Sequence, residues 1–198
     1  LGGLIDARLV QSSFADGTME SIGKNSVSIY GGVDTDKFYP SKQKIAGKFA
    51  FLGRILPHKG IEHLIRGLPE GSKLSVIGRT IDTDYLTFLQ HESVGKYVRF
   101  VHDATDIQVV ELLSSAEAVI LPSVHYDYAG RHQRFPELLG LVLLEAMSCG
   151  TAIVCSNVGG MPEVVSEGVT GFVVNPGSHT DIRSVLNKFL TQDSLAQD

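Results

Sequence analysis

Two glutamates, Glu137 and Glu145, lie eight residues apart in a stretch of the chain that is otherwise apolar. A carboxylate in such surroundings needs a charged or hydrogen-bonding partner, because burying it alone is costly. A carboxylate also accepts two hydrogen bonds from the vicinal hydroxyls of a sugar or a ribose. Between the two, Gly140 begins a predicted helix, and the amides of Gly140, Leu141 and Val142 are open to an oxyanion because glycine has no side chain.

The spacing of the two glutamates fits one particular kind of ligand. Eight residues of helix rise about 12 Å, and a nucleoside diphosphate-sugar has a similar extent from ribose to sugar. One carboxylate would then lie at each end of the ligand, with the diphosphate at the amides between them. The plainer interpretation also stays open, in which Glu137 caps the helix and Glu145 pairs with a surface lysine.

A second group of polar residues follows a short apolar segment near residue 52. Arg54, His58 and Lys59 surround Pro57, which suits the first turn of a helix. Cations at the positive end of a helix are unfavourable by about 0.3–1 kcal/mol each, and a bound anion would reverse that sign. The segment therefore predicts an anion site, unless Arg54 and Lys59 simply point into water.

No residue pattern indicates a metal site. Asp34-Thr-Asp36 and Asp82-Thr-Asp84 each precede a predicted turn or helix, where aspartate caps free amides. His58 and His63 have no third ligand nearby. Cys149 and Cys155 are expected to be buried, reduced thiols of a cytosolic protein. We therefore expect no metal and no other cofactor.

The composition is that of an ordinary globular protein, with 43% hydrophobic and 20% charged residues among 198. A net charge of −5 without any polybasic run argues against a nucleic-acid-binding protein. No apolar run approaches the roughly 20 residues of a membrane span. We expect a cytoplasmic location, with peripheral attachment to the inner membrane face left open. The absence of an initial methionine suggests a piece of a longer protein.

From residue 48 onward, short apolar runs alternate with helical patterns. The runs predicted as strands are Phe49–Leu52, Leu74–Ile77, Tyr97–Val101, Ala118–Leu121, Ala152–Cys155 and Phe172–Val174. The helices predicted between and after them are 58–67, Asp82–Glu92, Asp106–Ser114, Gly140–Ser148 and Thr180–Leu190. Strands that are apolar on both faces and alternate with helices indicate a parallel sheet covered on both sides. The fold class is therefore α/β, a doubly wound Rossmann-like sheet whose ligands bind at the carboxyl ends of the strands.

The first 47 residues follow a different pattern. The segments Ala7–Ser12 and Val27–Tyr30 each resemble a strand, and Gly31–Asp34 resembles a turn. We expect residues 1–25 to be the end of a preceding domain with its linker. Residues 26–190 would form the Rossmann-like domain, and the polar residues 191–198 a frayed tail.

Several motifs follow one another in a fixed order along this domain. They are Gly53-Arg54, Lys59-Gly60, Glu137-x7-Glu145 with Gly140-Leu141-Val142, Glu145-Ala146-Met147, and Gly159-Gly160-Met161-Pro162-Glu163. Together they resemble the carboxyl-terminal, donor-binding domain of the family-4 retaining glycosyltransferases, which have the GT-B fold. The resemblance covers about residues 5–190 and includes Gly32-Val33-Asp34 at the entrance of the domain.

The resemblance implies a role for each of these residues. Arg54 and Lys59, with the amides of Gly140 to Val142, would bind the diphosphate of a nucleotide-sugar donor. Glu145 would hold the ribose, and Glu137 would be the catalytic residue that faces the transferred sugar. Whether Glu137 is a nucleophile or a positioning residue stays open, and we favour positioning. The residues implied to line the base are His102, Asp103, Ala104 and Asp106.

The chain departs from the family in the link before the first glutamate. Residues 124–136 lengthen this link, and the resemblance implies that they border the sugar pocket with Arg131, His132 and Arg134. Two interpretations are open for these three residues, namely contact with the substrate or a solvated surface loop. The acceptor-binding amino-terminal domain of the family is missing apart from its apparent end.

The sequence thus predicts a metal-independent retaining hexosyltransferase that uses a UDP, GDP or ADP sugar. The acceptor, a glycan, glycolipid or small molecule, would bind mainly to the missing domain, so this chain alone is expected to bind donor without catalysing transfer. The alternatives are a catalytically silent nucleotide-binding module and a sugar-nucleotide epimerase or phosphorylase of the same fold. A dinucleotide-dependent oxidoreductase is disfavoured, because no Gly-x-Gly-x-x-Gly opens a helix.

Overall fold

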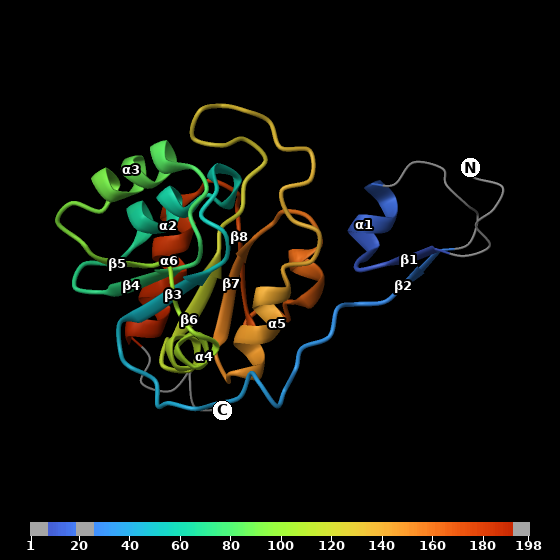
Figure 1. The fold of residues 1–198 in the computed structure, drawn as a ribbon, viewed down its shortest axis with the longest axis horizontal. Helices are drawn as coiled ribbons and strands as arrows, with labels where there is room; N and C mark the ends of the chain where they lie inside the picture. Colours follow the sequence, from blue (N-terminus) through green and yellow to red (C-terminus); the bar gives the residue numbers. More distant parts are fainter. Residues whose placement is uncertain (1–7, 19–25, 192–198) are drawn as a thin grey trace.

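The computed structural model describes residues 8–18 and 26–191. Its main body is a six-stranded, all-parallel sheet in the order β5-β4-β3-β6-β7-β8 (Figure 1). The strands are β3 (Lys48–Leu52), β4 (Lys73–Ile77), β5 (Tyr97–Val101), β6 (Ala118–Leu121), β7 (Ala152–Ser156) and β8 (Gly171–Val174). All six were predicted, each with ends within one residue, so the doubly wound α/β fold is confirmed.

Helices cover both faces of this sheet. They are α2 (Ile61–Gly67), α3 (Thr83–Glu92), α4 (Asp106–Ser114), α5 (Leu141–Ser148) and α6 (His179–Thr191), with 3-10 turns at η2 (Pro57–Lys59) and η3 (Met161–Val164). On one face α2 packs against α3 and α6, and α4 and α5 cover the other face (Figure 1). The core lies between these layers, and it includes Phe49 and Phe51 of β3, which are fully buried.

Local side-chain chemistry sets where several of these helices begin. The carboxylate of Asp82 accepts a hydrogen bond from the Tyr85 amide at the start of α3. Thr105 and Gln108 form a reciprocal capping box at the start of α4. Both helices therefore begin within one residue of the predicted position.

The helix predicted from residue 58 is wrong at its start. Pro57–Lys59 form a separate 3-10 turn, and α2 begins only at Ile61. Gly60 between them has φ 63°, a left-handed conformation that interrupts a continuous helix. A side chain at this position would come within 2.4 Å of the Pro122 carbonyl oxygen, so glycine lets the chain after β3 pass close to the chain after β6.

The amino-terminal part forms a separate two-stranded parallel sheet of β1 (Arg8–Val10) and β2 (Ser26–Ser28), joined through α1 (Ser13–Thr18). The first predicted strand is confirmed in its central part, whereas Ala7 lies outside the described residues. The second predicted strand lies earlier in the chain than expected, and α1 was not predicted. The sheet lies off the main body (Figure 1).

The connection between the two parts also differs from its prediction. The turn expected at Gly31–Asp34 instead begins at Asp34, whose carbonyl accepts a hydrogen bond of 2.8 Å from the Phe38 amide. The Asp34 carboxylate fixes this position, because it accepts bonds from the amides of Asp36 and Lys37. The expected domain boundary near residue 25 and the tail after Thr191 lie outside the described residues.

Candidate functional site

The order of the strands determines where the ligand crevice of a doubly wound sheet would lie. The chain runs outward from β3 to β5 in one direction and from β6 to β8 in the other, so the two central strands form the topological switch point. In doubly wound sheets this is the place where ligands bind. The segment that follows β3 carries Arg54 and Lys59, and the segment that follows β6 leads to Glu137 and α5.

An ion pair joins these two segments. The Lys59 ammonium lies 2.5 Å from the Glu137 carboxylate, and the two side chains are only 12% and 17% exposed. Both side chains are largely withdrawn from bulk water, so each charge depends on the other. Arg54 on the same segment is exposed. Lys59, predicted to bind phosphate, and Glu137, predicted to face the sugar, are therefore in direct contact.

The helix start beside these cations lies at Ile61, two residues after Lys59, rather than at His58. The first amide of α2, from Ile61, donates a hydrogen bond of 3.1 Å to the Tyr85 hydroxyl. The Tyr85 hydroxyl in turn donates to the carboxylate of Glu62 at 2.5 Å. Buried side chains thus occupy the start of α2, and the partner of Lys59 is Glu137 rather than an anion at this helix start.

This buried polar group was not foreseen from the sequence. Glu62 is completely buried, and His63 lies 3.4 Å from its second carboxylate oxygen. Burial raises the pKa of Glu62, and the hydrogen bond from Tyr85 lowers it in part. Burial, together with Arg66 nearby, lowers the pKa of His63. The available signal was the same as for Glu137, an acidic residue within an apolar run.

The start of α5 matches its prediction and is open. Gly140 is the N-cap residue with φ 79° and ψ 59°, and no side chain caps the helix. A side chain at this position would meet Met161 at 3.1 Å and Leu121 at 3.2 Å. Leu141, the first helical residue, is 41% exposed. The amides at the start of α5 are therefore available to an anionic ligand.

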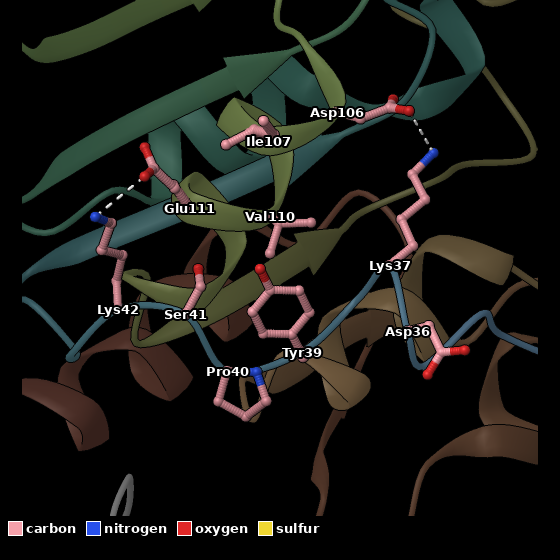
Figure 2. Close-up of a pocket in the computed structure, with 10 residues that line it drawn as sticks. All are labelled: Asp36, Lys37, Tyr39, Pro40, Ser41, Lys42, Asp106, Ile107, Val110 and Glu111. Carbon is pink, nitrogen blue, oxygen red and sulfur yellow. Dashed lines mark ion pairs between the residues drawn. The ribbon is translucent and has the colours of Figure 1, made fainter.

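Glu145 lies one turn before the end of α5 and is half-buried. Burial raises the pKa of its carboxyl group, and the positive charge of Lys37 lowers it in part. Lys37 itself makes an ion pair of 2.9 Å with Asp106, the first residue of α4 (Figure 2). In the plainer interpretation Glu145 pairs with a surface lysine, but Lys37, whose charge reaches Glu145, makes its ion pair with Asp106.

A groove lies between residues 36–42 and α4 (Figure 2). Two ion pairs cross it, one from Lys37 to Asp106 and one of 3.1 Å from Lys42 to Glu111. These pairs are well exposed and contribute little to stability. They join the connecting segment to α4, and the charge of Lys37 also acts on Glu145 of α5.

The residues implied to line the base follow β5. The Nδ1 atom of His102 lies 3.3 Å from both the Thr80 hydroxyl and the Gly78 carbonyl oxygen. Asp103 is exposed, and Ala104 is half-buried against the core. Thr80, which follows β4, was not singled out from the sequence. Its hydroxyl next to His102 adds a polar group to the loops at this end of the sheet.

The lengthened loop, residues 124–136, is an ordered structure fastened to α3. The ring of Tyr128 stacks on Phe88 at 4.8 Å and lies 5.2 Å from Tyr85. Asp127 accepts bonds from two loop amides and pairs with Arg131 at 2.9 Å, although its own side chain is almost fully buried. The loop therefore has a defined shape.

The three loop residues singled out from the sequence lie in different surroundings. Arg131 pairs with the Asp127 carboxylate of its own loop, and its side chain is 60% exposed. The ring of His132 lies 5.0 Å from that of Tyr126, and the guanidinium of Arg134 lies 4.9 Å from the ring of Phe135. Contacts of these residues with a substrate therefore stay a prediction.

The first aspartate of each Asp-x-Asp pattern has a capping role, as predicted, because Asp34 and Asp82 each accept hydrogen bonds from backbone amides. Within residues 8–18 and 26–191, no cluster of three histidine, cysteine or acidic side chains forms a metal site. Cys149 and Cys155 are buried and not disulfide-bonded, as predicted. Burial raises the pKa of the Cys155 thiol to about 12, so it is unreactive at neutral pH. The described helices are also too short or too polar to cross a membrane.

Solved structures share this fold. The Anabaena protein HepE, solved in complex with UDP-glucose, superposes with a TM-score of 0.79 over 95% of this chain and 54% of its own, at 22% identity. The carboxyl-terminal domain of the group 1 glycosyl transferase LpcC from Francisella tularensis superposes over 84% of this chain and 93% of its own, with a TM-score of 0.66 and 23% identity. The latter is similar in extent to the domain described here.

Sequence relatives point in the same direction. The α-maltose-1-phosphate synthase of Mycobacterium tuberculosis is 32% identical over 74% of this chain and 41% of its own length. The D-inositol 3-phosphate glycosyltransferase of Mycolicibacterium smegmatis is 29% identical over 85% of this chain and 40% of its own. The chain thus spans about two fifths of the curated relatives it matches. Residues 34–198 match the family described as "Glycosyl transferases group 1", and the chain belongs to that family.

Proposed function

We propose that this chain is the donor-binding half of a retaining glycosyltransferase, which transfers a hexosyl unit from a nucleoside diphosphate-sugar to an acceptor. The observation that carries the proposal is the ion pair between Lys59 and Glu137 across the switch point, beside the uncapped start of α5. A cation, a carboxylate and open helix amides meet there. This combination suits a ligand that has phosphate groups next to sugar hydroxyls.

In this proposal the diphosphate binds between the two segments that follow β3 and β6. Lys59 and Arg54 supply positive charge, and the amides of Gly140, Leu141 and Val142 supply hydrogen bonds. When the nucleoside diphosphate leaves, negative charge builds up on its phosphate. Fixed cations in a crevice with little water stabilise that charge, which is the role that a divalent metal fills in other enzymes. We therefore propose that transfer does not require a metal.

The two glutamates act on the hydroxyls at either end of the donor. Glu145 is half-buried, and hydrogen bonds from the two ribose hydroxyls offset the cost of keeping its carboxylate charged. Glu137 faces the transferred sugar and orients it close to the anomeric carbon. Its ion pair with Lys59 keeps the carboxylate in place before the donor arrives. We propose a positioning and charge-stabilising role for Glu137, with retention of the anomeric configuration.

Structures of the same fold support a nucleotide-sugar as the donor. The Anabaena protein HepE, which has the same fold, was solved in complex with UDP and with UDP-glucose. The acceptor would bind to a further domain, of which β1, α1 and β2 are a part. Two parallel strands are not a stable unit on their own, because parallel sheets are normally buried on both faces. We therefore propose that these strands continue into a larger sheet in the full-length protein.

A screen of nucleotide-sugars against the full-length protein tests this function, with each reaction analysed for product and for its anomeric configuration. We expect consumption of at least one UDP-, GDP- or ADP-sugar, an axial or equatorial linkage that matches the donor, and loss of turnover in Glu137→Ala. Lys73→Ala is the control, because this exposed residue begins β4 at the amino-terminal end of the strands, opposite the carboxyl ends. Inverted products would refute retention, and full turnover by Glu137→Ala would refute the role of that residue.

A further inference from the structure

The carboxylate of Glu163 joins the amino-terminal part of the chain to the main body. Glu163 belongs to η3, which follows β7. Its two oxygens accept hydrogen bonds from the amides of Ser13 and Phe14, both at 2.9 Å, and from the Tyr30 hydroxyl at 3.0 Å. A single side chain thus holds the first turn of α1 and the segment after β2.

Ser12 makes a second link, and this one reaches the segment of the first glutamate. The Ser12 side chain is completely buried, and its hydroxyl donates to the Leu138 carbonyl oxygen at 2.8 Å. The same hydroxyl accepts a bond of 3.0 Å from the Ala15 amide, so it also caps α1. Leu138 is the residue that follows Glu137. Its carbonyl additionally accepts a bond of 3.1 Å from the Gly160 amide.

Residues 12–14, the backbone of Glu137 and Leu138, and η3 meet at one junction. Gly159 and Gly160 show how closely these segments approach one another. A side chain at Gly160 would lie 2.2 Å from the Leu138 carbonyl oxygen and 2.7 Å from the Ser12 hydroxyl. A side chain at Gly159, which has φ 61°, would lie 1.9 Å from the Glu137 carbonyl oxygen. The backbone of Glu137 and Leu138 is therefore clamped between η3 and the segment that begins α1. Movement of any one of these three segments would be transmitted to the other two.

Charge strengthens the junction. Burial raises the pKa of Glu163, but the hydrogen bonds from Phe14 and Ser13 lower it by more, so its pKa lies below the ordinary range. The group is a carboxylate at neutral pH and makes charge-assisted bonds to the backbone of α1. The part of the chain with β1, α1 and β2 lies off the main sheet (Figure 1). Its placement therefore depends strongly on this junction.

We propose that Ser12 and Glu163 are positioning residues for Glu137. They transmit the placement of the amino-terminal part of the chain to the backbone that carries this glutamate, so that the sugar-facing carboxylate is aligned only when that part is docked. The proposal rests on the function proposed above for Glu137. It adds a structural route by which the acceptor side of the protein controls the geometry of the donor side.

The test uses Ser12→Ala, Glu163→Gln and the milder Tyr30→Phe in the full-length protein, with Glu70→Gln as control. Glu70 is exposed and lies before β4, away from the junction. For Ser12→Ala and Glu163→Gln, we expect kcat to fall about tenfold on the nucleotide-sugar that the wild type consumes, while the Kd of its nucleoside diphosphate changes by less than about twofold. Amide hydrogen exchange in residues 137–142 should become about tenfold faster.

Rescue and refutation follow from the same variants. Ser12→Thr keeps the hydroxyl and should restore much of kcat and the slow exchange. Unchanged exchange in residues 137–142 of Ser12→Ala would overturn the proposal, and so would equal losses in kcat and nucleotide affinity. If Ser12→Ala fails to fold, Tyr30→Phe takes its place in the kinetic, binding and exchange measurements. Tyr30 is 48% exposed, and this variant loses only a hydroxyl group. A wild type that neither binds nor consumes any nucleotide would refute the proposed function instead, while exchange would still test the junction.

Discussion

The ion pair between Lys59 and Glu137 leads to an unusual prediction about nucleotide affinity. Lys59 has two tasks in our proposal, since it neutralises Glu137 in the free protein and the diphosphate in the complex. The diphosphate must therefore compete with Glu137 for this ammonium group. We predict that Glu137→Gln, which removes the competing charge, makes a nucleoside diphosphate bind more tightly while turnover is lost.

The size of the effect can be worked from the geometry. Two unit charges about 4 Å apart attract by about 4 kcal/mol at an effective dielectric constant of about 20. The net value of a charge-assisted hydrogen bond is about 1.5–3 kcal/mol. Both side chains are mostly buried at 12% and 17% exposure, so screening by solvent is limited. We expect Lys59→Met to weaken nucleotide binding by about 10–150-fold, because it removes a cation and leaves the Glu137 carboxylate facing the phosphate.

For Glu137→Gln we expect binding that is about three- to tenfold tighter. The double variant should bind more tightly than Lys59→Met alone, since the repulsive carboxylate is gone. Isothermal titration calorimetry of the full-length protein with UDP, GDP and ADP measures these affinities, and the differences should shrink as salt is added. Weaker binding by Glu137→Gln would refute the competition, and so would a double variant no better than Lys59→Met.

Three further predictions concern other parts of the site. Because burial raises the pKa of Glu145 and the ribose requires its charged form, nucleotide affinity measured by calorimetry should fall as pH decreases through that raised pKa, and Glu145→Gln should flatten this profile. Gly159→Ala should lower the free energy of unfolding by about 2 kcal/mol or more, measured by thermal unfolding, because its new side chain would collide with the Glu137 carbonyl at a backbone conformation that alanine disfavours. Tyr85→Phe should cost about 1–3 kcal/mol in urea denaturation, because it leaves buried Glu62 without its donor, whereas Tyr97→Phe at an exposed hydroxyl should change nothing.

Much of the fold was predictable because its signals are local. Strands such as Ala118–Leu121 are fully apolar and short, and the caps at Asp82 and Thr105 mark where the next helices begin. The error at residues 58–60 has a non-local cause. Nothing in that segment reveals that Gly60 must fit against the Pro122 carbonyl, which lies 62 residues later in the chain.

The sequence suggested residue types for the candidate site but not the contacts between them. Apolar surroundings singled out Glu137 and Glu145, and the order of motifs implied their roles. Sequence spacing gave no indication that Lys59 and Glu137 meet, because their 78 residues of separation are closed only by the pairing of β3 with β6. Glu163 was quoted as part of a motif, yet its bonds to α1 depend on segments about 150 residues away.

The central claim is that the crevice beside β3 and β6 binds a nucleoside diphosphate. Calorimetric titration of the full-length protein with UDP, GDP and ADP tests it most directly, with Arg54→Ala and the control Lys73→Ala measured alongside. Our account predicts binding of at least one of these nucleotides with one site per chain, about tenfold weaker binding in Arg54→Ala, and unchanged binding in Lys73→Ala. Absence of binding for all three nucleotides at millimolar concentration, or equal affinity for wild type and Arg54→Ala, would contradict it.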